Sequence, residues 1–76
     1  MKVRDVQVGR HYVLGTGHIS RALEVLEPDP FPHGGHGHKE YAVPTVRFEN
    51  GRRLNGRWIR RLATADEVLK GKVADG

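Results

Sequence analysis

Residues 41–62 constrain the fold of this chain more than any other segment, because they contain its clearest hairpin signal. Val46 and Phe48 lie two positions apart in a run of β-forming residues, a spacing typical of a strand with one buried face. Asn50-Gly51 follows this run, and both residue types tolerate the positive φ angles of tight hairpin turns. The segment therefore predicts an antiparallel hairpin.

The register of this hairpin depends on the length of its loop. A two-residue loop would place Phe48 opposite Arg53, whereas a three-residue loop over 50–52 would place Phe48 opposite Leu54. We expect the second register because it keeps apolar side chains on one face, and a slip of one residue would turn the whole set to the other face. In that register Phe48, Leu54 and Trp58 line the core.

The return strand is predicted over residues 53–59, and it should end in a short helical turn in which Ile59 meets Leu62. Six of the nine arginines lie in the hairpin segment. Their planar guanidinium groups suit phosphate oxygens and base edges, and alternate arginines on the strands (47, 53 and 57) should point away from the core. The candidate nucleic-acid-binding residues are Arg47, Arg52, Arg53, Arg57, Arg60 and Arg61.

The same arginines could serve a different purpose. They could contact an acidic protein, or they could keep strand edges charged and so prevent edge-to-edge pairing. Arginine outnumbers lysine nine to four, which is also typical of GC-rich coding, as in a high-GC bacterium or a phage that infects one.

Trp58 also has two interpretations. It could stack on an exposed base, with the neighbouring arginines adding cation–π support. A single indole buries a large area, however, so a place in the core of a small barrel is the favoured interpretation.

Size and composition bound the class of protein. A chain of 76 residues makes one small domain, which buries roughly 60% of its unfolded surface and has a marginal core. The absence of cysteine excludes disulfides and thiolate metal sites. The net charge of +4 favours attraction to polyanions. With neither an apolar run of the ~20 residues that cross a bilayer nor a signal-peptide core, a cytoplasmic protein with no membrane contact is expected.

The remaining segments complete a single domain over residues 1–76. Strands are expected over residues 11–15 and 19–27, separated by glycines; the second segment also has a possible helical face. Residues 28–40 are rich in proline, glycine and histidine and are expected to form a flexible loop.

The C-terminal end carries a helix signal. Thr64 as N-cap and Glu67 three residues later form a capping box. Val68 and Leu69 should dock on the barrel, and Gly71 should end the helix. Residues 72–76 are expected to fray.

The order of these elements resembles small SH3-like β-barrels of the Tudor and KOW type. The resemblance covers residues 6–64 and is carried by the segments 8–13, 23–27, 46–51 and 59–62. It implies a mainly-β fold, namely an SH3-like, partly open barrel of four to five antiparallel strands with a short C-terminal helix. This fold serves as a platform for many functions.

The histidines of the loop are candidate metal ligands. His33, His36 and His38 have a spacing at which three imidazoles could bind Zn²⁺, Ni²⁺ or Cu²⁺, with His18 or water as a fourth ligand. A structural zinc site is normally closed by cysteine, so a mobile loop is the favoured interpretation, and no cofactor is expected.

No catalytic pattern is recognised. Ser20 has His18 two residues away, but no third group is in view to orient them. We therefore expect a small basic accessory module that binds DNA or RNA and is not an enzyme. The alternative is a module that docks on an acidic partner, for example a phage protein that modulates a host protein; the chain itself is expected to be a monomer or an edge-paired homodimer.

Overall fold

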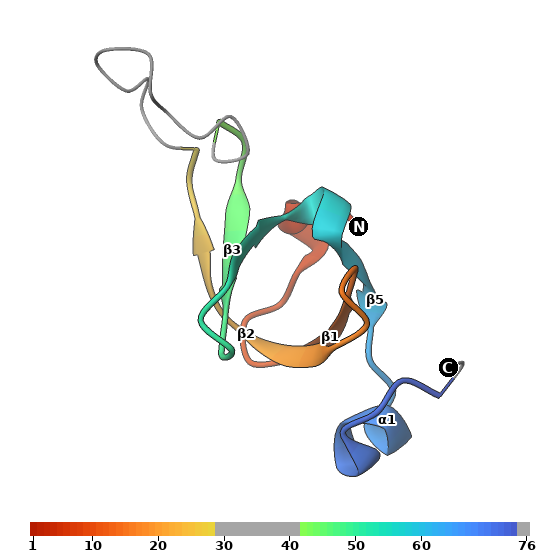
Figure 1. The fold of residues 1–76 in the computed structure, drawn as a ribbon. Helices are drawn as coiled ribbons and strands as arrows, with labels where there is room; N and C mark the ends of the chain where they lie inside the picture. The colour runs from red at the N-terminus through yellow and green to blue at the C-terminus, as the bar shows by residue number, and fades with distance from the viewer. Residues whose placement is uncertain (29–41, 75–76) are drawn as a thin grey trace.

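The chain folds into a single antiparallel sheet that curls into a partly open barrel (Figure 1). The computed structural model describes residues 1–28 and 42–74. The five strands pair in the order β4-β3-β2-β1-β5. They comprise β1 (His11–Leu14), β2 (Ile19–Leu26), β3 (Thr45–Phe48), β4 (Arg53–Asn55) and β5 (Ile59–Leu62). The mainly-β, partly open fold predicted from the sequence is confirmed.

Within residues 1–28 and 42–74, three short helical elements accompany the strands. The 3-10 turn η1 (Val3–Asp5) precedes β1, and a second 3-10 turn, η3 (Gly56–Trp58), joins β4 to β5. The helix α1 (Ala65–Lys70) follows β5 and confirms the short C-terminal helix. Within the described part of the chain, no helix is long and apolar enough to cross a membrane.

Strand β2 connects the two halves of the sheet. Its first residues pair with β1 and its last residues pair with β3, and the β2–β3 register shifts between Ala22 and Glu24. Such an irregularity bends a strand and increases its twist, which lets one sheet curl around a core.

The core is formed by side chains from several strands and from the N-terminal segment. Tyr12, Phe48, Leu14 and Ile59 are its largest fully buried side chains. The Tyr12 hydroxyl accepts a hydrogen bond from the backbone N–H of Gln7 at 2.7 Å, so its polar end is satisfied. The remaining buried members of this cluster are Val3, Val6, Ala22 and Val46, with Leu54 packed against them.

The hairpin forms where the sequence predicts, but the expected register is wrong by two residues. Val46, not Phe48, lies opposite Leu54. The loop occupies residues 49–51, and Gly51 takes a φ of +88° at its last position. A glycine in this conformation commonly ends a three-residue hairpin loop. Since side chains alternate with a period of two, a two-residue shift leaves the same residues facing the core.

The predicted return strand over 53–59 is also wrong. Strand β4 ends at Asn55, and the helical turn expected after Ile59 comes before it, as η3. The Asn55 side chain accepts a hydrogen bond from the backbone N–H of Arg57 at 3.0 Å, which caps this turn. Gly56 is required here because a Cβ at this position would collide with the Met1 carbonyl oxygen.

The capping box predicted at the start of α1 is confirmed. The Thr64 hydroxyl accepts from the Glu67 N–H at 3.1 Å, and the Glu67 carboxylate accepts from the Thr64 N–H at 3.0 Å. Gly71 ends the helix in the left-handed conformation, as expected. The docking predicted for Leu69 is wrong, because this side chain is 86% exposed, whereas Val68 is half-buried.

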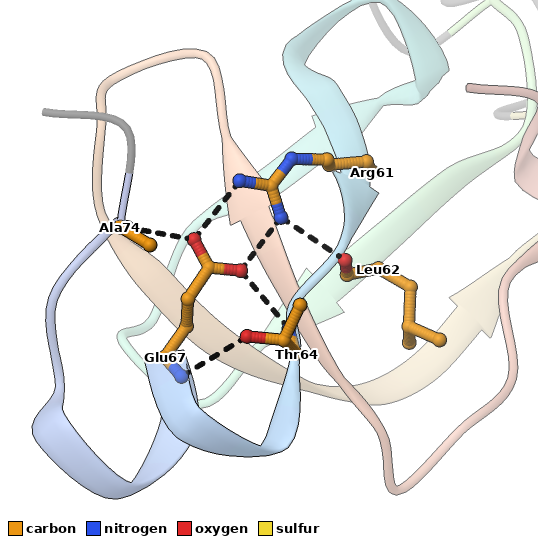
Figure 2. Close-up of polar contacts among 5 residues, drawn as sticks. All are labelled: Arg61, Leu62, Thr64, Glu67 and Ala74. Atoms are coloured by element: carbon orange, nitrogen blue, oxygen red, sulfur yellow. Dashed lines mark hydrogen bonds and ion pairs between the residues drawn. The ribbon is translucent and has the colours of Figure 1, made fainter.

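An ion pair anchors α1 in place of that apolar contact (Figure 2). The Glu67 side chain is buried and receives two hydrogen bonds from the Arg61 guanidinium, at 2.6 and 2.9 Å. The backbone N–H of Ala74 donates to the same carboxylate at 2.9 Å. These donors, Arg61 first, hold the pKa of Glu67 well below its usual range although burial acts in the opposite direction.

Candidate functional site

The arginines predicted to form one binding face divide into two groups in the structure. Arg47 forms an ion pair with Glu24 at 3.3 Å, and Arg61 is bound to Glu67. The half-buried Arg53 donates through Nε to the Thr45 hydroxyl at 2.7 Å. The guanidinium groups of these three arginines are already engaged within the molecule.

The other three predicted arginines are exposed and form no ion pair within residues 1–28 and 42–74. Arg52 lies between the hairpin loop and β4, whereas Arg57 and Arg60 lie beyond the other end of β4. Arg57 does not continue the strand alternation with Arg47 and Arg53, because it belongs to η3. Arg57 and Arg60 therefore lie in the consecutive elements η3 and β5, at the other end of β4 from Arg52.

Two further cations lie beside η3 because η1 packs against it. The Met1 nitrogen donates to the carbonyl oxygens of Gly56 and Ile59 at 3.1 and 2.9 Å. Lys2 and Arg4 line a shallow groove that also includes Gly56. Its other walls are Val3, Val43 and Pro44. The two 3-10 turns can be followed in Figure 1, next to the chain start.

We call this region the η1–η3 surface and define it by Lys2, Arg4, Arg57, Trp58 and Arg60. Its four cations are exposed and form no ion pair within the described part of the chain. Asp5, in η1, is the one carboxylate that these two turns contribute. Sequence reasoning missed Lys2 and Arg4, because only the packing of the N-terminal turn brings them to the arginines.

Trp58 lies on this surface and not in the core. It is 47% exposed, so the favoured prediction that it lines the core is wrong. The turn η3 carries the chain out of the strand, and Ile59 takes the buried position next to it. The second Asn-Gly pair of the sequence, at 55–56, was the available signal for this turn.

The indole ring of Trp58 is held from one side by the turn between β1 and β2. The backbone N–H of Gly15 donates to the Trp58 carbonyl oxygen at 2.6 Å. A Cβ added to Gly15 would lie 2.9 Å from Cε3 of the ring, so only glycine allows this approach. One part of the Trp58 ring therefore packs against Gly15, and the rest of the residue is exposed to solvent.

The remaining candidate residues do not form a site in the described chain. The buried Ser20 hydroxyl accepts from the Asn50 N–H at 3.2 Å, whereas the exposed His18 ring contacts the Thr16 hydroxyl at 3.1 Å. His33, His36 and His38 lie outside the described residues. Elsewhere in residues 1–28 and 42–74, no group of three metal-binding side chains comes together.

Comparison with known proteins identifies no relative of this chain. No protein-family model, curated protein or solved structure matches the chain. A functional assignment therefore rests on the residues of the η1–η3 surface.

Proposed function

We propose that the protein is a small nucleic-acid-binding module that contacts phosphate groups through the η1–η3 surface. The observation that carries this proposal is the distribution of charge. Arg21, Arg47, Arg61 and Lys70 are paired with carboxylates. Lys2, Arg4, Arg57 and Arg60 form no such pair within the described residues. The first two lie in or next to η1, and the last two lie in η3 and in β5 directly after it.

Unpaired arginines are well suited to phosphate. A guanidinium stays charged at every physiological pH and can donate two parallel hydrogen bonds to phosphate oxygens. Contacts of this kind position a nucleic acid without reading its sequence. We therefore expect binding with little sequence preference.

The salt dependence of binding tests the proposal. Fluorescence anisotropy of labelled single-stranded DNA, RNA and duplex DNA, measured over a series of salt concentrations, gives the number of phosphates neutralised. Four contacts predict a slope of log K against log salt of about −3, because each contact contributes roughly −0.7 to −0.9. Millimolar binding to all three nucleic acids that disappears with modest added salt would contradict the proposal.

A second candidate function follows from the groove itself. Its apolar walls, Val3, Val43 and Pro44, lie beside two cations, which suits an acidic peptide with an apolar side chain as well as a phosphate chain. A Val43→Asp substitution separates the two. It should prevent a protein partner from binding after nuclease treatment, whereas it should weaken nucleic-acid binding only by the charge that it adds.

A further inference from the structure

We propose that Trp58 is a base-stacking platform and that the η1–η3 surface therefore binds single-stranded nucleic acid in preference to duplex. This inference rests on the proposed function and specifies the form of its ligand. It is carried by the exposed indole, by its contact with Gly15, and by the exposed Arg57 and Arg60, which lie near Trp58 in the sequence.

The position of the ring favours stacking. Gly15 lies against one part of the Trp58 indole, and Trp58 is 47% exposed. An aromatic ring that is already ordered loses little conformational freedom when a base stacks on it. The contact with Gly15 thus keeps the ring in one place before a ligand arrives.

The charge of the residues near the ring suits an unpaired nucleotide. Arg57 precedes Trp58, and Arg60 follows the buried Ile59, so exposed guanidinium groups stand on both sides in the sequence. A nucleotide presents a flat apolar base together with a phosphate, and single-strand-binding proteins commonly pair stacking aromatics with cations. Charge complementarity therefore selects a polyanion that also carries accessible rings.

Duplex DNA is a polyanion but offers no accessible base rings, because its bases are stacked on one another inside the helix. Charge alone would favour the duplex, which carries one negative charge per about 1.7 Å of helix axis. A preference for the single strand must therefore come from the bases. This opposition makes strand preference a sharp test of the role of Trp58.

The experiment compares three probes of about twelve nucleotides each, within the site sizes common for single-strand binders. They are a single-stranded DNA, the same phosphate chain made of abasic residues, and a duplex. The single strand should bind at least roughly tenfold more tightly than the abasic chain. Because Trp58 is the one tryptophan of the chain, its fluorescence should be quenched by the single strand and not by the other two probes.

Substitutions identify the residue. Trp58→Ala should reduce single-strand affinity to that of the abasic chain, and Trp58→Phe should retain part of the difference. Gly15→Ala should displace the ring, shift the emission of Trp58 and weaken single-strand binding, while abasic binding stays unchanged. Circular dichroism shows that each variant is folded before binding is compared.

Several results would overturn the inference. Equal affinity for single-stranded and abasic chains, without quenching, would leave the phosphate contacts and the proposed function standing but remove stacking. Absence of binding to all three probes would remove the proposed function as well. Quenching by vesicles of anionic phospholipid in the absence of any DNA binding would assign the surface to a lipid headgroup layer.

Discussion

Replacing Arg57 and Arg60 together with glutamate should weaken binding to single-stranded DNA by roughly a hundredfold. Each charge-assisted hydrogen bond to a phosphate is worth about 1.5 kcal/mol, and about 1.4 kcal/mol corresponds to a tenfold change in Kd. The loss of two phosphate contacts should also reduce the slope of log K against log salt by about 1.4. Anisotropy titrations over a salt series measure both effects.

The matched control is the double substitution Lys70→Glu with Lys72→Glu. It changes the net charge by the same amount but lies in and after α1, away from η1 and η3 (Figure 1). If the effect is local, this control should lose much less affinity than the arginine variant. Equal losses in both variants would mean that net charge alone drives binding and that the η1–η3 surface is not a site.

Replacing Glu67 with glutamine should lower the midpoint of thermal unfolding by several degrees and release α1 from the barrel. Glu67 is 1% exposed, and its carboxylate accepts hydrogen bonds from Arg61, Thr64 and Ala74. A glutamine amide cannot accept all of these hydrogen bonds, and it leaves the Arg61 guanidinium without its counter-ion. Thermal unfolding followed by circular dichroism measures the loss.

Asp66→Asn provides the matched control for this prediction. Asp66 lies on the same helix, but its pair with Lys70 is exposed on both sides. Exposed pairs contribute roughly 0 to 1 kcal/mol, so its loss should change the midpoint little. If the Glu67 and Asp66 variants unfolded at the same temperature, the anchoring role of Glu67 would be wrong.

The contribution of Glu67 should also depend on pH. Because its pKa is lowered in the folded protein, the folded state binds this proton more weakly than the unfolded chain does. Its stabilisation is therefore complete above the unfolded carboxyl pKa of about 4.3 and decreases as the pH falls below that value. The difference in unfolding midpoint between wild type and Glu67→Gln should be constant near neutral pH and shrink in acid.

The fold could be predicted from local signals where those signals act through adjacent residues. The alternation of Val46 and Phe48, the turn at Asn50-Gly51 and the capping box of Thr64 and Glu67 each depend on neighbours in the chain. The structure confirms the elements that they predict. The register could not be fixed in the same way, since two registers that differ by two residues keep the same side chains facing inward.

The surface could be predicted only in part. The arginine-rich sequence indicates that Arg57 and Arg60 are candidate binding residues. It does not reveal that Arg47 pairs with Glu24 and that Arg61 pairs with Glu67. The exposure of Trp58 depends on how the core is filled. Ile59, Phe48 and Tyr12 occupy the interior, and η3 turns the indole outward.

Backbone amide chemical shifts of the isotope-labelled protein, recorded while single-stranded DNA is added, test the central claim most directly. We predict that the largest shifts at saturation fall on residues 2–5, 15–17 and 56–60, and that α1 (Ala65–Lys70) is unaffected. Shifts concentrated at the hairpin turn around Arg52 or on α1, or no shifts at a saturating concentration, would contradict a nucleic-acid site on the η1–η3 surface.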